Sequence, residues 1–226
     1  MRILLGSTGS VAATLTPRLI AELSARGHTV EVVATESSRY FFDPAALGVR
    51  VWQDSDEWPK SAENLPVPRS TPLPPHEDAC SLVAEGRAKP FHPSAPRSLR
   101  SGIPTNAYAR DQEIPHIALG KWADALLIAP CSANTLAKIA NGMCDNLLTG
   151  VARAWDRTKP IILAPAMNTR MWEHPATAEH LATLRRWYPH CTIIEPVAKR
   201  LACGDTGIGA LAPIATIVGA IALEEK

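Results

Sequence analysis

Short apolar runs and stretches with helical apolar spacing alternate from the start of the chain. Residues 3–5 predict a buried strand, and the glycine- and serine-rich residues 6–10 predict a tight turn after it. Pro17 predicts a bend or a late start in the helix that follows, because proline lacks the amide hydrogen that a helix interior needs. The apolar positions of that helix recur three or four residues apart: Val11, Leu15, Leu19, Ile20 and Leu23.

Further apolar runs predict the rest of a sheet. Strands are expected over residues 29–34, 125–129, 161–164 and 192–194, and a closing helix over residues 214–223. Strands that alternate with helices indicate an α/β fold with a largely parallel sheet.

A proline-rich stretch interrupts this alternation. Residues 54–113 hold ten of the twenty prolines and few apolar runs. This composition predicts an irregular, partly disordered insert at about residues 59–113, within a single domain over residues 1–226. The stretch lacks the apolar pattern that a second packed domain would need.

Composition and charge narrow the class of protein. Apolar residues make up 46% of the chain, and the formal net charge is +1, so we expect a packed core and no nucleic-acid partner. No apolar run is long enough to span a membrane, and the start does not resemble a signal peptide. Five irregularly spaced cysteines, without zinc spacing, predict free thiols in the cytoplasm and no metal site.

The first candidate for binding chemistry is the turn over residues 6–10. Glycines let the backbone approach a ligand, and hydroxyls beside a helix start can bind phosphate. The turn is not a GxGxxG fingerprint, which favours a mononucleotide over a dinucleotide; a plain βα turn is the alternative. Thr35 and Ser37, after the second strand, are either extra hydroxyl contacts or a polar loop.

Two more segments follow buried strands. Residues 130–135 contain Asn134, which either caps a helix or holds a substrate carboxylate or a flavin edge. Residues 165–172 contain Met167 and Asn168 at the edge of the sheet where ligands bind in open α/β folds. The alternative for this second segment is core packing by its methionines and tryptophan, with a capping asparagine.

The last two candidates are a glycine-rich segment and a histidine. Residues 201–210 hold three glycines within six residues, which predicts a flexible flap rather than a helix or strand. Such a flap can close over a substrate and present Cys203, although a buried inert thiol is the commoner fate of a cysteine. His116, taken alone, is more often structural or a surface residue.

Three of these segments together resemble the motifs of the homo-oligomeric flavin-containing cysteine decarboxylases. They are Pro-x-Ser-Ala-Asn-Thr at residues 130–135, Pro-Ala-Met-Asn-x-x-Met-Trp at 165–172, and Ala-Cys-Gly-Asp-x-Gly-x-Gly-Ala at 202–210. Further segments resemble the plant and animal phosphopantothenoylcysteine decarboxylases, namely residues 54–58, 122–124, 144–149 and 153–156. The resemblance covers residues 1–58 and 114–226.

The resemblance implies roles for individual residues. His116 resembles the active-site histidine, and Cys203 resembles the flap cysteine that acts as an acid in the final reduction. The implied substrate-binding residues are Asn134, Met167, Asn168, Lys121, Ala202 and Gly204. The implied FMN-binding residues are Gly6, Ser7, Thr8, Gly9, Thr35, Ser37, Ser132, Ala133, Thr135 and Met167.

The resemblance also implies a fold, an assembly and a reaction. The fold would be an open, doubly wound parallel sheet in a three-layer, flavodoxin- or Rossmann-like flavoprotein. The assembly would be a homotrimer with active sites between subunits, acting on a small molecule. FMN would oxidise a cysteine substrate to a thioaldehyde, CO2 would leave, and the ene-thiol would be reduced again. For the plant and animal enzymes this reaction converts 4′-phospho-N-pantothenoylcysteine to 4′-phosphopantetheine in coenzyme A synthesis.

Two positions depart from the plant and animal pattern. Gly120-Lys121 stands where those enzymes have two arginines, and lysine keeps the charge but loses the two-pronged grip on a carboxylate. Leu211 stands at a methionine position of the flap.

Three alternatives to this function stay open at this point. They are a decarboxylase of C-terminal peptidyl cysteine, a non-catalytic flavoprotein that regulates a phosphatase, and a flavin prenyltransferase. Retention of His116, Asn134 and Cys203 argues against the regulator, and a prenyltransferase has no need of the flap.

Overall fold

Six parallel strands form the central sheet of the chain. A computed structural model describes residues 1–57, 113–200 and 206–224. The strand order is β3-β2-β1-β4-β5-β6, and every neighbouring pair is parallel. The strands are β1 (Arg2–Ser7), β2 (Thr29–Ala34), β3 (Val51–Trp52), β4 (Ala125–Cys131), β5 (Ile161–Pro165) and β6 (Cys191–Ile193). The central strands β4 and β5 are buried along their whole length, as expected for a parallel sheet covered on both faces.

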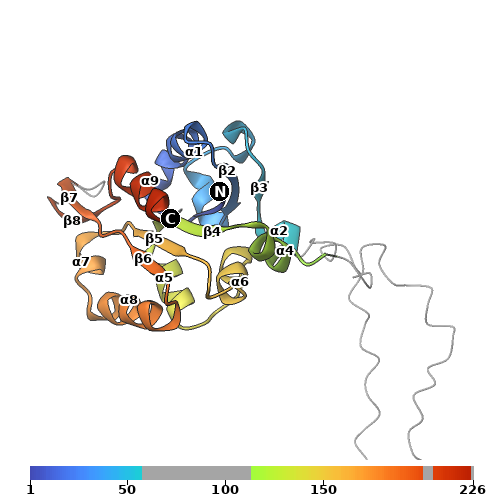
Figure 1. Cartoon of the computed structure of the whole chain (residues 1–226). Coiled ribbons are helices and arrows are strands. Elements are labelled where there is room, and N and C mark those ends of the chain that lie inside the picture. Colours follow the sequence, from blue (N-terminus) through green and yellow to red (C-terminus); the bar gives the residue numbers. More distant parts are fainter. Residues whose placement is uncertain (58–112, 201–205, 225–226) are drawn as a thin grey trace, which may run out of the picture. The chain divides into compact units, whose positions relative to one another are not determined.

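Helices cover both faces of this sheet, which gives three layers (Figure 1). On one face, α1 (Thr16–Ala25) and α9 (Ile214–Leu223) pack on an aliphatic core that includes Leu5, Val32 and Leu127. On the other face, the core includes Leu4, Leu126 and Leu163. The helices there are α4 (Pro115–Trp122), α5 (Ala133–Ala140), α6 (Leu147–Arg153) and α8 (Pro175–Trp187). The predicted doubly wound, three-layer α/β class is therefore confirmed.

The predicted elements lie close to the observed ones. A 3-10 helix over Val11–Leu15 precedes α1, and Pro17 lies in the first turn of α1, where its missing amide hydrogen costs no helical bond. The late helix start is thus confirmed. The closing helix has the predicted limits, and the last strand is shifted by one residue from the predicted 192–194.

Short elements were missed by the sequence pattern. The strand β3 has only two residues, and the helices α2 (Asp54–Glu57) and α7 (Thr169–Trp172) have four each. Two further 3-10 helices, Glu36–Tyr40 and Pro44–Leu47, lie between β2 and β3. Elements of two to five residues contain at most one or two periods of their pattern, too few for periodicity to reveal them.

One prediction needs correction. The segment over residues 201–210 was expected to be a flap without regular structure, but β8 (Thr206–Ala210) is a strand that pairs antiparallel with β7 (Val197–Arg200). Hydrogen bonds to β7 hold the backbone of β8 in place, although its glycines have no side chains that could pack. Residues 201–205, with Ala202, Cys203 and Gly204, lie outside the described residues, as do residues 58–112 of the predicted insert.

The described part of the chain contains no helix that is long and apolar enough to cross a membrane.

A lysine holds the C-terminal end of α4. The Lys159 ammonium donates to the carbonyl oxygens of Gly120 at 3.0 Å and Ala123 at 2.7 Å, and lies 3.5 Å from that of Lys121. It also lies 5.6 Å from the centre of the Trp155 ring. The last carbonyls of a helix lack intrahelical partners and carry partial negative charge, so a cation there stabilises the helix end.

We expect Lys159→Met to lower the free energy of unfolding by about 1.5–3 kcal/mol, the range for hydrogen bonds to a charged group. Chemical denaturation of the two proteins measures the difference. Lys138→Met is the matched control, because the exposed Lys138–Asp145 ion pair should contribute about 0–1 kcal/mol. Equal losses in the two variants would contradict the prediction.

Candidate functional site

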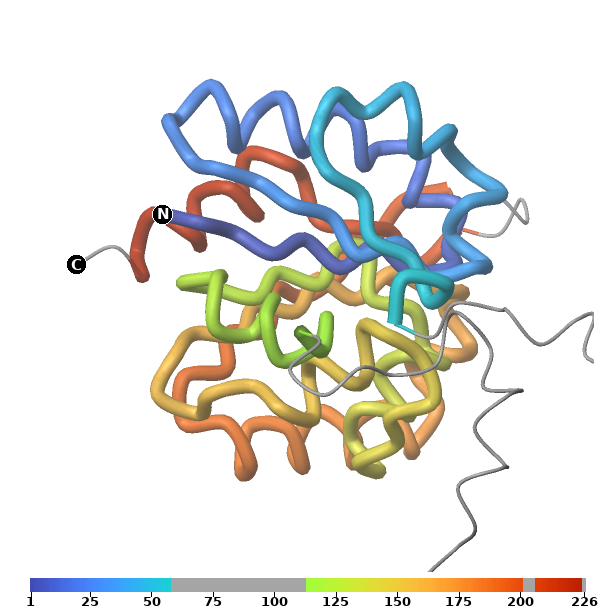
Figure 2. The backbone as a smooth tube through the Cα atoms, turned by 90° about the vertical axis from the view of Figure 1, so that its right-hand side faces the viewer, coloured from blue at the N-terminus to red at the C-terminus, as the bar shows by residue number. Residues whose placement is uncertain are grey.

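The sheet reverses its winding direction between β1 and β4. From β1 the chain moves outward through β2 to β3, and from β4 it moves outward the other way to β6. In open α/β sheets, ligands bind in the crevice at the carboxyl ends of the strands beside such a switch point. In Figure 2 the chain runs from the N-terminus along β1 toward that edge. The predicted residues of the loops after β1, β2, β4 and β5 all lie at this edge.

The loop after β1 is bonded to the loop after β4 by a buried hydroxyl. Thr8 Oγ1 donates to the Pro130 carbonyl at 2.7 Å and accepts from the Ser132 amide at 2.8 Å. Ser7, also fully buried, shares a 3.0 Å hydrogen bond with Thr16 Oγ1. The third hydroxyl of the predicted phosphate turn, that of Ser10, accepts from the Ala12 amide at 3.4 Å, so all three hydroxyls are engaged within the protein. Gly9 and Ser10, at the end of the turn, are partly exposed.

The two glycines of the turn are required by packing. A Cβ on Gly6 would lie 2.6 Å from Leu148 Cδ1, and one on Gly9 would overlap Ser37 Oγ. Gly6 thus lets β1 approach α6, and Gly9 lets the first and second loops touch. The groups that approach these two glycines closely are side chains of the protein itself, Leu148 and Ser37. Contact of the glycines with a ligand remains a prediction.

The remaining predicted cofactor residues form a cluster of hydroxyls. Thr35 Oγ1 donates to the Ser7 carbonyl at 3.3 Å and lies 3.4 Å from Ser37 Oγ. Ser132 caps α5, accepting from the Thr135 amide at 3.3 Å, and its hydroxyl lies 3.2 Å from Thr135 Oγ1. None of the predicted FMN residues carries a carboxylate, so the donor set suits an anionic phosphate.

Backbone hydrogen bonds join the three decarboxylase-like motifs. The Ala166 amide donates to the Cys131 carbonyl at 3.0 Å, which connects residues 165–172 to residues 130–135. The Met167 amide donates to the Gly209 carbonyl at 2.9 Å, which connects them to β8. Gly209 has a φ of +153°, and a Cβ there would overlap the Met167 carbonyl oxygen, so this junction requires glycine.

The asparagines and methionines of these motifs have different environments. Asn134 is exposed in the first turn of α5, while Asn168 caps α7, its Oδ1 accepting from the Arg170 amide at 2.9 Å. Met167 is buried in the core, and Met171 is 49% exposed. The capping and core-packing alternatives therefore hold for Asn168 and Met167, and a binding role is compatible with them.

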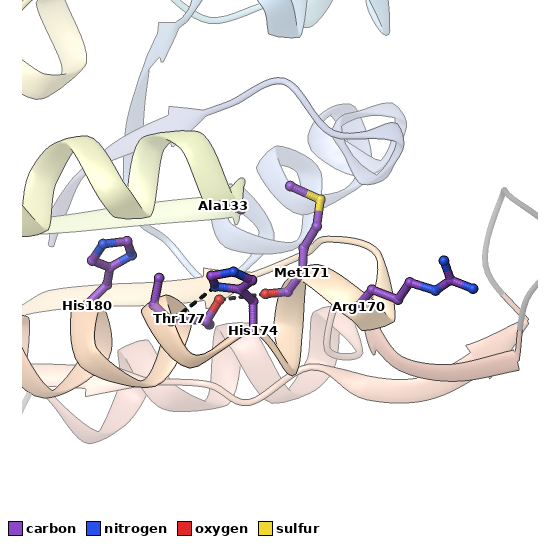
Figure 3. Close-up of a pocket in the computed structure, with 7 residues that line it drawn as sticks. Ala133, Arg170, Met171, His174, Thr177 and His180 are labelled. Atoms are coloured by element: carbon purple, nitrogen blue, oxygen red, sulfur yellow. Dashed lines mark hydrogen bonds between the residues drawn. The ribbon is translucent and has the colours of Figure 1, made fainter.

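A cavity of about 400 Å³ lies beside these motifs, between the start of α5, α7 and the start of α8. Figure 3 shows Met171, His174 and His180 at this cavity, with the Arg170 side chain extending away from the two histidines. His174 Nδ1 accepts from the Ala176 amide at 3.2 Å, so it caps α8. The cavity is lined by Ala133, Arg170, Met171, His174, Ala176, Thr177 and His180. No motif in the sequence indicated its α8 part.

His116 lies apart from the joined motifs within one chain. It occupies the first turn of α4, where it contacts Glu57 of α2 and packs against Gly150 of α6. Between the parts of the chain that the structure describes, no hydrogen bond links His116 to Asn134, Met167 or Asn168. Sequence reasoning missed Glu57, although it lies in the segment 54–58 that resembles the plant and animal enzymes.

Lys121 lies at the other end of α4, beside Lys159 and close to the amino ends of the strands. A single chain therefore does not bring Lys121 to the carboxyl edge where the other predicted residues gather.

The thiols of the described residues differ in burial. Burial raises the pKa of Cys131 to about 12, and that of Cys191 to about 11, while Cys144 is exposed. The motif cysteine at 131 is thus a packing residue rather than a reactive group. Across residues 1–57, 113–200 and 206–224, no group of three or more His, Cys, Asp or Glu side chains is arranged to hold a metal ion.

Comparison with known proteins identifies the class. The family model described as Flavoprotein matches residues 1–224. The chain therefore belongs to the flavoprotein family, in agreement with the fold and with the mononucleotide-type switch point.

Individual relatives narrow the comparison. The mouse phosphopantothenoylcysteine decarboxylase is 38% identical over 221 residues, which cover 97% of this chain and 85% of that protein. A probable thymidylate synthase of Schizosaccharomyces pombe is 41% identical over 232 residues, covering 99% of this chain but only 30% of that protein. The chain thus spans less than a third of that relative, and the relative's name refers to the whole of the longer protein.

Solved structures give the same picture. A cysteine-to-serine mutant of a PPC decarboxylase, complexed with pantothenoylaminoethenethiol, matches with a TM-score of 0.73 and 37% identity, covering 98% of this chain and 96% of that one. The FMN binding protein AtHal3 matches with a TM-score of 0.69 and 37% identity, covering 98% and 95%. The resemblance found in the motifs is confirmed by these relatives.

The raised pKa of Cys131 predicts a pH dependence of stability. Between about pH 9 and pH 12 the unfolded chain loses this thiol proton while the folded chain keeps it, so stability falls as pH rises. We expect a contribution of about 1.4 kcal/mol per pH unit in that window, absent in Cys131→Ala. Urea unfolding from pH 8 to 11 measures the slope.

The control for that measurement is Cys144→Ala, which removes an exposed thiol and should keep the wild-type slope. Parallel curves for wild type and Cys131→Ala would show that the buried thiol does not contribute.

Proposed function

We propose that the chain is an FMN-dependent phosphopantothenoylcysteine decarboxylase, which converts 4′-phospho-N-pantothenoylcysteine to 4′-phosphopantetheine in coenzyme A synthesis. The observation that carries this proposal is the joining of three motifs at one sheet edge through the Cys131–Ala166 and Met167–Gly209 hydrogen bonds. Three relatives at 37–39% identity over nearly the whole chain are named phosphopantothenoylcysteine decarboxylases, which supports the same substrate.

FMN is the cofactor that the switch point would hold. The loop amides of residues 6–10 and the hydroxyl cluster of Thr35, Ser37, Ser132 and Thr135 suit its phosphate, and Ala133 and Met167 would lie along its ring. Bound there, FMN supplies a hydride acceptor and later a hydride donor. The name of the FMN binding protein AtHal3, a neighbour of 37% identity, supports FMN over other flavins.

The side chains of the chain supply binding and proton transfer. Exposed Asn134 would hold the substrate carboxylate, with Met167 and Asn168 beside it. His116 would take the thiol proton as hydride leaves the adjacent carbon, because an imidazole is a base near neutral pH. Cys203, Ala202 and Gly204 would belong to the segment over the substrate, with Cys203 protonating carbon in the reductive half.

The separation of His116 from the joined motifs favours sites between subunits. A second chain that places its His116 and Lys121 against the first chain's motifs would complete the site, and a homotrimer is the assembly that the family resemblance implies. We place the protein in the cytoplasm, in keeping with its free thiols.

We further propose one FMN-binding domain over residues 1–226, with residues 59–113 as an insert. The hydrogen bonds between Glu57 and His116 close the base of that insert, so that the flavoprotein elements on its two sides are held together directly.

The function is tested by mixing the purified, FMN-loaded protein with phosphopantothenoylcysteine and measuring 4′-phosphopantetheine and CO2. We expect both products in equal amounts, with no net consumption of FMN. Turnover only of a peptide with C-terminal cysteine would assign a peptidyl substrate, and no turnover of either compound would favour a non-catalytic flavoprotein.

We expect Cys203→Ser to stop after decarboxylation. Oxidation needs a hydride acceptor and a base, and neither is Cys203, whereas the return of hydride needs an acid, and a hydroxyl is a far weaker acid than a thiol of ordinary pKa about 8.5. The variant should release CO2 and accumulate a product that lacks two hydrogens relative to phosphopantetheine, detected by mass spectrometry.

His116→Asn is the matched variant for the first half of the reaction. It should bind FMN but release no CO2. Full-speed phosphopantetheine formation by Cys203→Ser, or failure of that variant to reduce its flavin, would place Cys203 elsewhere in the mechanism.

A further inference from the structure

A carboxylate from a different element holds both nitrogen donors at the start of α4. Glu57 Oε2 accepts from the His116 backbone amide at 3.1 Å, and Glu57 Oε1 lies 2.5 Å from His116 Nδ1. The Glu57 side chain is 6% exposed and that of His116 is 26% exposed. The contact is therefore largely shielded from water, where a charge-assisted hydrogen bond is strong.

This contact replaces the usual cap of a helix. The N-cap residue of α4 is Ile114, whose side chain cannot accept a hydrogen bond. Glu57 supplies the missing acceptor from 59 residues away in the sequence. A buried carboxylate is expensive to desolvate, and a serine or aspartate at position 114 would cap the helix at less cost. Capping alone therefore does not account for Glu57.

The chemistry of the two partners fixes the tautomer of the imidazole. An ionised carboxylate only accepts hydrogen bonds, so the ring nitrogen beside it, Nδ1, must carry the hydrogen. In neutral His116 the lone pair then lies on Nε2, at the far side of the ring. Within the described ranges, Nε2 forms no hydrogen bond with the protein, so this nitrogen is the one available to a substrate.

Glu57 is itself held in place. Its helix α2 is anchored at the other end by Asp54, whose Oδ1 accepts from the Leu147 amide at the start of α6 at 2.9 Å. The four-residue helix α2 thus binds the first turns of two longer helices, one with each end. This arrangement fixes Glu57 relative to α4 independently of any ligand.

We propose that Glu57 is a positioning residue for His116, which sets the Nδ1–H tautomer and the ring orientation so that Nε2 accepts the substrate proton. This inference rests on the proposed function for the identity of that substrate. The role is distinct from the capping role of Asp54, and the two residues of the same short helix can therefore be compared directly.

Glu57→Gln tests the proposal with almost no change of shape. An amide has one oxygen, so either Nδ1–H or the His116 backbone amide would face an NH2 donor. The arrangement that keeps the backbone bond turns NH2 toward Nδ1 and favours the opposite tautomer, with hydrogen on Nε2. We expect kcat for phosphopantothenoylcysteine to fall about 10- to 100-fold with KM little changed.

The second measurement is the tautomer itself. Nitrogen-15 NMR of the FMN-loaded protein, at mildly alkaline pH and with His116 assigned by its loss in His116→Asn, should show a protonated Nδ1 and a bare Nε2. The Glu57→Gln spectrum should show the reverse. Glu57→Asp keeps a group that only accepts hydrogen bonds, and should keep the wild-type tautomer and recover part of the lost kcat.

The matched control is Asp54→Asn, whose amide oxygen can still accept from the Leu147 amide, so α2 stays anchored while it loses a carboxylate that does not contact His116. It should keep the wild-type tautomer and kcat. The proposal would be overturned if Glu57→Gln kept the wild-type tautomer and the wild-type kcat. It would also be overturned if Glu57→Gln and Asp54→Asn lost kcat equally while the tautomer stayed unchanged. If the wild-type protein does not turn over phosphopantothenoylcysteine, the proposed function fails, while the NMR comparison still decides the role of Glu57.

Discussion

The buried hydroxyl of Thr8 connects the two halves of the sheet at the point where the winding direction reverses. Because it both donates to Pro130 and accepts from Ser132, it fixes the loop after β1 against the loop after β4 in position and in orientation. The Cys131–Ala166 bond continues the connection to the loop after β5, and the Met167–Gly209 bond extends it to β8. One continuous series of hydrogen bonds therefore spans the carboxyl edge and fixes the positions of the three motifs relative to one another.

The second constraint on the site is that charged side chains from other elements hold both ends of α4. Glu57 supplies negative charge at its N-terminal end, and Lys159 supplies positive charge at its C-terminal end. Both charges have the sign that complements the helix dipole. Since α4 has only eight residues, the position of His116 depends on both ends. Neither charged residue belongs to α4, so the helix is positioned by its neighbours more than by its own sequence.

The main elements were predictable because their signals are local. The continuous apolar runs at β4 and β5, the start of α1 beside Pro17 and the apolar helix α9 all follow from residues adjacent in sequence. The strand β8 was not predictable, because its glycines suggest mobility and its order comes from β7 and from Met167.

The polar contacts within the candidate site were not predictable from the sequence, and the binding roles of its residues stay predictions. Thr8 is predicted to lie near FMN, and the structure adds that its hydroxyl bonds Pro130 and Ser132, more than a hundred residues away. Glu57 and His116 meet across the proline-rich stretch, and no period or spacing in the sequence encodes that contact. Long-range polar contacts depend on the assembled tertiary structure, so they cannot be predicted from a pattern of residues that are neighbours in sequence.

The burial of Cys131 bears on how the protein withstands oxidants and electrophiles. Since only the thiolate reacts appreciably, the raised pKa of about 12 keeps this thiol almost entirely in its unreactive form at pH 7. Cys191 is protected in the same way to a smaller degree, whereas Cys144 is open to solvent. Of the thiols in the described residues, alkylating reagents should therefore modify Cys144 first. Burial thus protects Cys131, at the carboxyl end of β4, most strongly, because the folded protein disfavours its nucleophilic thiolate.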